Sequence, residues 1–263
     1  MTFFDEAGKV IPAADWMRRY EPYYFLGDPS SKRVNRRNKT SPFIEDQVCA
    51  LLNKSTFLSK DDLVLLMAWK LGLVDHGSSE EHKKIIFKQD FGAKLISTGQ
   101  FRPLDFSKSI PYLATNMAEI VKNLTLNPQY LVNKVRGPHP ELEGFGITYI
   151  LTVQFFVTHG KYPIYDKFAH IGAIAICQDL KPGAPIEWAS VQDWNDYLRY
   201  VELLNAISAA CSQSGSSSPT TVPRPVDRAL WVYGHFFQQA KTAKSLPTMT
   251  GTRSLRILRI LKG

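Results

Sequence analysis

The chain has 263 residues, of which 44% are hydrophobic and 12% aromatic, and its formal net charge is +8 at pH 7. A chain of this length and composition can bury a sizeable core in one large domain or two closely packed subdomains, which excludes a largely disordered protein. The positive charge favours a polyanionic partner, and the sequence has no run of 18 apolar residues that could form a membrane-spanning helix.

Helical periodicity and helix-end signals dominate the first half of the chain. They predict helices over residues 13–20, 42–52, 60–71, 80–90 and 110–123. Ser41 and Ser59 are the expected N-caps of the second and third of these helices. The basic segment 32–39 fits either a solvated loop or an arm that contacts phosphates.

The second half of the chain shows the same periodicity. It predicts helices over residues 128–136, 147–159, 166–178, 188–213 and 225–240. Residues 214–223 are rich in Ser, Thr and Pro and are expected to form a mobile linker. Residues 253–262 alternate Leu or Ile with Arg or Lys, which fits either a closing element of the fold or a basic tail. Because β alternation is scarce and no internal repeat is visible, the expected class is all-α.

Two glycines one residue apart, Gly144 and Gly146, lie between the predicted helices 128–136 and 147–159. Gly146 can open a helix whose first backbone N–H groups have no partner inside the helix, and such groups suit an anion such as a phosphate. Asp166 stands just before the next predicted helix, where the helix dipole favours an ionised carboxylate.

The segment Leu142-Glu-Gly-Phe-Gly-Ile resembles the hairpin of the helix-hairpin-helix superfamily of DNA glycosylases, whose pattern is Leu-Pro-Gly-hydrophobic-Gly. In that superfamily an aspartate follows the second glycine at about the distance that separates Gly146 from Asp166 here. The resemblance is confined to residues 141–175. It implies an all-α, two-lobed fold with a DNA cleft between the lobes. Residues 41–135 would form the central lobe, residues 136–263 the lobe with the hairpin and the aspartate, and residues 1–40 would pack with that second lobe.

The resemblance also implies roles for particular residues. Asp166 would be catalytic, and DNA would be bound by Leu142, Gly144, Phe145, Gly146, Ile147 and Thr148. Glu143 replaces the usual proline and puts a negative charge near the expected phosphate. Thr148 stands where bifunctional members carry a Schiff-base lysine, so the resemblance implies a monofunctional enzyme.

One carboxylate is enough for this chemistry. Cleavage of the bond between C1′ and the base passes through an oxocarbenium-like sugar, and a nearby carboxylate can stabilise that charge and direct a water molecule. Considered alone, Asp166 would be the N-cap of the helix that follows it, and the two roles are compatible.

A base taken out of the duplex needs a pocket with apolar or aromatic walls. The candidates for this base pocket are Trp69, Lys70, Tyr165 and Lys167, and the further aromatic candidates are Phe168, Trp231 and Tyr233. For each aromatic residue a place in the core is the alternative. The six histidines show no metal-binding spacing, and three cysteines cannot hold a four-cysteine iron–sulfur cluster. No cofactor is expected, although the hairpin could hold a monovalent cation.

The sequence therefore predicts a monomeric enzyme that acts on double-stranded DNA with a flipped base. Its odd, scattered cysteines and the lack of a signal peptide indicate a cytoplasmic protein of bacterial type, associated with the nucleoid and not with a membrane. It would release an oxidised or alkylated base in DNA repair, or a hypermodified phage cytosine in antiviral defence, and leave an abasic site. Two alternatives stay open: a bifunctional glycosylase and lyase that uses Lys161 or Lys167, and a non-catalytic protein that binds DNA through the hairpin alone.

Overall fold

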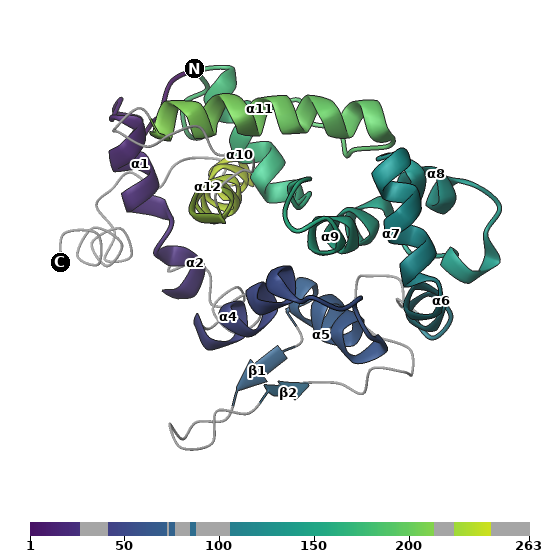
Figure 1. The fold of residues 1–263 in the computed structure, drawn as a ribbon. Coiled ribbons are helices and arrows are strands. Elements are labelled where there is room, and N and C mark those ends of the chain that lie inside the picture. The colour runs from purple at the N-terminus through teal and green to yellow at the C-terminus, as the bar shows by residue number, and fades with distance from the viewer. Residues whose placement is uncertain (27–41, 73, 77–84, 88–105, 213–223, 243–263) are drawn as a thin grey trace. The chain divides into compact units, whose positions relative to one another are not determined.

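The computed structural model describes residues 1–26, 42–72, 74–76, 85–87, 106–212 and 224–242 (Figure 1). This part of the chain is mostly helical, which confirms the predicted helical class. The basic segment 32–39, the Ser41 cap, the linker 214–223 and the basic tail 253–262 lie outside the described residues.

The chain divides into two compact units, which we name by their main features. The hairpin unit comprises the described parts of Thr40–Ile164 and Val191–Asp196. The α10 unit comprises the described parts of Met1–Lys39, Tyr165–Ser190 and Tyr197–Gly263. This division differs from the predicted one, because residues 136–164 group with residues 42–135.

The hairpin unit is built around one buried helix. Its helical elements are α4 (Pro42–Ala50), η1 (Leu51–Asn53), α5 (Lys60–Lys70), α6 (Ser109–Thr115), α7 (Met117–Leu126), α8 (Tyr130–Arg136), η3 (Pro140–Leu142) and α9 (Ile147–Val157). Every residue of α9 from Ile150 to Val157 is buried, as expected for a helix that is apolar on all sides. α5, α8 and η1 pack against α9, and Nε2 of Gln154 on α9 donates a hydrogen bond to the Pro128 oxygen at 2.8 Å.

Two side chains set helix ends in this unit. Oγ of Ser59 accepts a hydrogen bond from the Asp62 N–H at 3.2 Å, and Oδ2 of Asp62 accepts one from the Ser59 N–H at 2.7 Å. This capping box confirms Ser59 as the N-cap of α5. The helix predicted over 110–123 is divided into α6 and α7 at Asn116, whose side chain donates to the Tyr112 oxygen at 2.8 Å. An asparagine side chain competes with the helix for backbone groups in this way.

A small antiparallel sheet is the exception to the helical pattern. It consists of β1 (Val74–His76) and β2 (Ile85–Phe87), with Val74 opposite Phe87. The helix predicted over residues 80–90 is therefore wrong at 85–87. Short runs of β-branched and aromatic residues suit a strand as well as a buried helix, and periodicity alone does not separate the two.

The α10 unit holds the remaining helices. They are α1 (Ala13–Tyr20), α2 (Tyr23–Leu26), α10 (Lys167–Cys177), α11 (Trp194–Ser212), which joins this unit from Tyr197 onward, and α12 (Arg224–Thr242). α1 and α2 pack against α12, and α12 packs closely against α10 (Figure 1). Trp16, Tyr20 and Tyr233 form an aromatic core between α1 and α12, with ring centroids 5.0 to 5.7 Å apart.

α11 begins later than predicted. Oδ1 of Asp193 accepts a hydrogen bond from the Asp196 N–H at 3.0 Å, as an N-cap aspartate does. The helix therefore starts at Trp194, and the prediction of helix over residues 188–193 is wrong. The prediction followed the apolar periodicity back to Trp188 and took no account of Asp193, which is a typical N-cap residue.

Candidate functional site

The hairpin between α8 and α9 is anchored by its two apolar residues. Leu142 and Phe145 are 2% and 1% exposed. The Phe145 ring packs against Phe106 and Tyr149, with centroid distances of 5.2 and 5.7 Å. The Phe145 N–H donates to the Leu142 oxygen at 3.0 Å, which closes the turn. The side chains of Leu142 and Phe145 thus face the interior of the hairpin unit and hold the turn in place.

The two glycines lie on the outside of the same turn. Gly144 and Gly146 are both exposed, and a Cβ built on either would meet no atom within 4 Å. Gly144 has φ +79°, in the left-handed region that favours glycine. Gly146 has φ −65° and ψ 164°, which any residue can adopt. Backbone conformation therefore explains why residue 144 is a glycine. Neither backbone conformation nor packing against the described residues requires a glycine at position 146.

The backbone of the turn presents a row of N–H groups. In the described part of the chain, the N–H groups of Gly144, Gly146, Ile147 and Thr148 have no hydrogen-bond acceptor. Those of Ile147 and Thr148 belong to the first turn of α9, where the helix dipole is positive. Open glycine surface and unsatisfied N–H groups together suit the close approach of an anion. Glu143 is exposed next to this surface.

Thr148 lies in the first turn of α9 and is half-buried. Its carbonyl oxygen accepts a hydrogen bond from Oγ1 of Thr152 at 2.9 Å. A hydroxyl at this position cannot form an imine with a sugar aldehyde.

Asp166 stands at the N-cap of α10, in the α10 unit. Its Oδ1 accepts a hydrogen bond from the Phe168 N–H at 2.8 Å. The preceding residue, Tyr165, is 2% exposed and packs edge-on against Tyr200, with ring centroids 5.2 Å apart. The capping role that the sequence suggested for Asp166 is thus present, and it fixes the carboxylate at the positive end of the helix.

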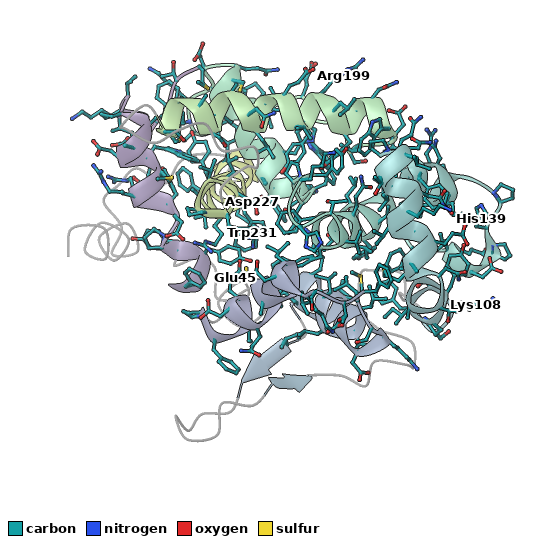
Figure 2. All side chains as sticks on the ribbon, viewed as in Figure 1. Glu45, Lys108, His139, Arg199, Asp227 and Trp231 are labelled. Atoms are coloured by element: carbon teal, nitrogen blue, oxygen red, sulfur yellow. The ribbon has the colours of Figure 1, made fainter. Side chains whose placement is uncertain are left out.

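Asp227 on α12 (Figure 2) is a further carboxylate, and it does not belong to the pattern of hairpin and spaced aspartate. Tyr200 is fully buried; burial raises the pKa of its hydroxyl well above the ordinary value, and the charges of Asp227 and Asp166 raise it further. Two carboxylates therefore lie within electrostatic reach of one buried hydroxyl. Asp227 also forms an ion pair with Arg224. Its only sequence signal is Arg-x-x-Asp at a helix start, which is a common pattern.

The four predicted base-pocket residues belong to two different units. Trp69 and Lys70 end α5 in the hairpin unit, whereas Tyr165 and Lys167 flank Asp166 in the α10 unit. Trp69 is 9% exposed, and its Nε1 donates to Oε2 of Glu45 at 3.2 Å. Glu45 itself is only 2% exposed. These contacts favour a core role for Trp69.

The other aromatic candidates lie in the α10 unit and differ in accessibility. The Phe168 ring is stacked on His235, with centroids 3.4 Å apart, and Trp231 lies 4.2 Å from the same imidazole. Phe168 and Trp231 are partly exposed. Phe168 follows Asp166 by two residues, so a partly exposed aromatic ring lies close to Asp166 in the chain. Tyr233 is 0% exposed and belongs to the aromatic core.

The described residues contain no group of three or more His, Cys, Asp or Glu side chains that could hold a metal ion. Cys49, Cys177 and Cys211 lie on three different helices, α4, α10 and α11, and none is in a disulfide. Within the same described ranges, no helix is both long and apolar enough to cross a membrane.

The candidate site therefore has two parts: the hairpin with its unsatisfied N–H groups in the hairpin unit, and the carboxylate of Asp166 in the α10 unit. Comparisons of the chain with protein-family models, with curated proteins and with solved structures found no match.

Proposed function

We propose that the protein is a monofunctional DNA glycosylase that hydrolyses the bond between C1′ and a damaged or modified base and leaves an abasic site. The observation that carries this proposal is the exposed hairpin, where the N–H groups of Gly144, Gly146, Ile147 and Thr148 have no acceptor among the described residues. Asp166 follows this hairpin by twenty residues. The substrate class is an oxidised or alkylated base, or a hypermodified phage cytosine.

The proposal extends to the fold, a two-lobed helix-hairpin-helix arrangement in which the two units are the lobes. It is supported by the division of the chain into two compact, mostly helical units. It is also supported by α8 and α9, which flank the hairpin and pack against each other.

The hairpin would bind one phosphate of the DNA backbone. Backbone N–H groups at a helix start bind phosphate through hydrogen bonds and through the helix dipole, without reading the base sequence. The absence of a Cβ at Gly146 leaves the surface open for this approach. The exposed carboxylate of Glu143 opposes it and lowers the affinity that the hairpin can supply.

Asp166 would act on the sugar. As the bond from C1′ to the base nitrogen breaks, its electron pair leaves with the base and the sugar becomes cationic. A carboxylate nearby stabilises that cation and takes a proton from the water that adds to C1′. The N-cap position supports this role, because the helix dipole favours the ionised form of Asp166.

The monofunctional assignment rests on Thr148, since the lyase reaction needs an amine that forms an imine with C1′. Lys161 and Lys167 are both exposed, so a bifunctional enzyme that uses one of them is the main rival within enzymes. Borohydride reduction in the presence of abasic DNA separates the two, because only an imine is trapped as a covalent adduct.

A second candidate is a DNA-binding protein without catalysis. It is favoured by the hydrogen bond from the Phe168 N–H to Asp166, which gives the carboxylate a structural role without any chemistry. Such a protein would use the hairpin alone and would bind duplex DNA without releasing a base.

The test is mass spectrometry of the bases released from a panel of oxidised, alkylated, deaminated and phage-modified duplex DNAs. The proposal expects at least one free base and an abasic strand that breaks only after alkali or heat. Duplex binding without release from any member of the panel would favour the non-catalytic candidate. Strand breakage without alkali, together with a borohydride-trapped adduct, would favour the bifunctional enzyme.

A further inference from the structure

Three side chains of the α10 unit, Lys167, Trp188 and His170, form a group that begins at the residue after Asp166. Nζ of Lys167 lies 4.9 Å from the centroid of the Trp188 ring. Nε1 of Trp188 donates a hydrogen bond to Nδ1 of His170 at 3.3 Å. Lys167 and His170 are three residues apart on α10 and therefore share one face of the helix. The indole of Trp188 thus contacts two side chains of α10: the ammonium of Lys167 lies over its ring, and His170 accepts a hydrogen bond from its N–H.

The bond to Trp188 determines the tautomer of His170. An indole N–H can only donate, so Nδ1 of His170 accepts, and the proton of the neutral ring lies on Nε2. The imidazole also packs edge-on against Tyr200, with centroids 5.1 Å apart, and against Tyr165 at 5.7 Å. His170 is therefore held by packing while it fixes the orientation of the indole.

Trp188 in turn restricts the ammonium group of Lys167. Attraction between a cation and the face of an indole favours positions of Nζ above the ring. Lys167 is exposed and forms no ion pair with any described residue. An ammonium has three N–H donors, so a group held over a ring can still donate to a second, anionic partner.

We propose that Lys167 binds a phosphate of the nucleotide processed at Asp166, and that Trp188 and His170 are its positioning residues. This rests on the proposed function for the identity of the nucleotide. Lys167 directly follows Asp166, and the sugar that loses its base carries a phosphate on either side. A positive charge on the residue that follows Asp166 also reduces the repulsion between the carboxylate and that phosphate.

The first experiment compares Lys167→Met with Lys181→Met. Both changes remove one exposed lysine charge of the α10 unit, and Lys181 follows the other end of α10. The probe is a duplex with a tetrahydrofuran abasic-site analogue, and its affinity is measured over a range of salt concentrations. Each phosphate contact contributes roughly 0.9 to the slope of log affinity against log salt. Lys167→Met should lower the slope by about one and weaken binding roughly tenfold. Lys181→Met should change neither, and equal slopes for wild type and Lys167→Met would overturn the proposal.

The second experiment tests the positioning residues. In His170→Asn the amide oxygen can replace Nδ1 as the acceptor of the indole N–H, whereas His170→Leu offers no acceptor. His170→Leu should weaken binding of the abasic-site duplex, and His170→Asn should restore most of it. In the Lys167→Met background the leucine variant should have no further effect. An equal loss with and without Lys167 would show that His170 does not act through Lys167 and would overturn its positioning role.

These results separate this inference from the glycosylase proposal. If Lys167→Met lowers the salt slope while no DNA in the panel loses a base, the phosphate contact stands and the glycosylase proposal fails. If bases are released in an Asp166-dependent way while the slope of Lys167→Met is unchanged, the glycosylase proposal stands and the phosphate contact fails.

Discussion

The backbone oxygen of Phe168 lies so close to Gly234 that a Cβ on residue 234 would be 1.8 Å from it. A Cβ on Gly172 would be 2.6 Å from the Leu230 oxygen. These two glycines therefore set the distance at which α10 and α12 cross. Asp166 is two residues before Phe168, so the crossing also positions the end of α10 that carries the candidate catalytic carboxylate.

Gly234→Ala should destabilise the protein strongly. The overlap with a backbone atom can be relieved only if α10 and α12 move apart, and overpacking of this kind costs roughly 3 kcal/mol or more. Denaturant unfolding followed by circular dichroism measures the loss. Gly146→Ala is the matched control, because its Cβ would meet open space at an ordinary φ and should cost no more than about 1 kcal/mol at a helix N-cap. Equal stabilities of the two variants would contradict the close crossing.

Gly146→Ala should nevertheless weaken binding of duplex DNA several-fold. Its methyl group would stand on the exposed side of the hairpin, where the phosphate has to approach the N–H groups of α9. Fluorescence anisotropy with a labelled duplex at fixed salt measures the change. Wild-type affinity in a variant with a wild-type melting temperature would reduce the hairpin to a connection between two helices.

Asp166→Asn should separate catalysis from capping. Asparagine and aspartate are comparable N-caps, so the melting temperature should hardly change, whereas base release should fall by about 10²–10³. A purely structural Asp166 predicts a different pattern, in which Asp166→Ala loses around 1 kcal/mol of stability and keeps its activity per folded molecule. Single-turnover base release and thermal unfolding of both variants decide. Excision at the wild-type rate by a folded Asp166→Asn protein would end the catalytic assignment.

Trp69→Phe should affect stability and not base release. The change removes the indole N–H that donates to the buried carboxylate of Glu45, and loss of such a partner costs roughly 1–3 kcal/mol. Activity per folded molecule should stay at the wild-type level. A large loss of base release in a variant of unchanged melting temperature would instead place Trp69 in the base pocket.

The positive charge of the chain is concentrated in two segments. Residues 27–41 and 243–263 hold ten of the 32 Lys and Arg residues but only one of the 24 Asp and Glu residues. The remaining chain therefore holds 22 basic and 23 acidic residues, and it is close to neutral. Both segments lie outside the described residues, and the sequence alone gives their charge.

Glutamine at four of the five basic positions of segment 243–263, Arg253, Arg256, Arg259 and Lys262, should therefore weaken duplex binding and lower its salt slope by roughly three. The same substitution at four scattered lysines controls for the loss of total charge: Lys9, Lys60, Lys122 and Lys181. If the control variant lost as much of the salt slope, net charge and not its position would govern DNA binding.

The sequence by itself determined features whose causes are local. The Ser59 capping box involves residues three apart, and the Asp166 cap involves residues two apart, so both could be predicted without knowledge of the fold. The sequence also marked the hairpin by its two glycines, whereas the burial of Leu142 and Phe145, which were expected to bind DNA, is seen only in the structure. The all-α expectation also came from periodicity along single helices.

Only the tertiary structure decided features that need a partner distant in sequence. Ile85–Phe87 is a strand because Val74–His76 pairs with it, and its own residues did not distinguish a strand from a helix. Trp188 is not helical; its indole instead donates to His170 on α10, a contact that no periodicity reveals. The buried carboxylate of Glu45 likewise accepts its hydrogen bond from Trp69, which is 24 residues away. Local signals indicate where helices begin and end. Long-range contacts determine which side chains lie together, and a functional site consists of such side chains.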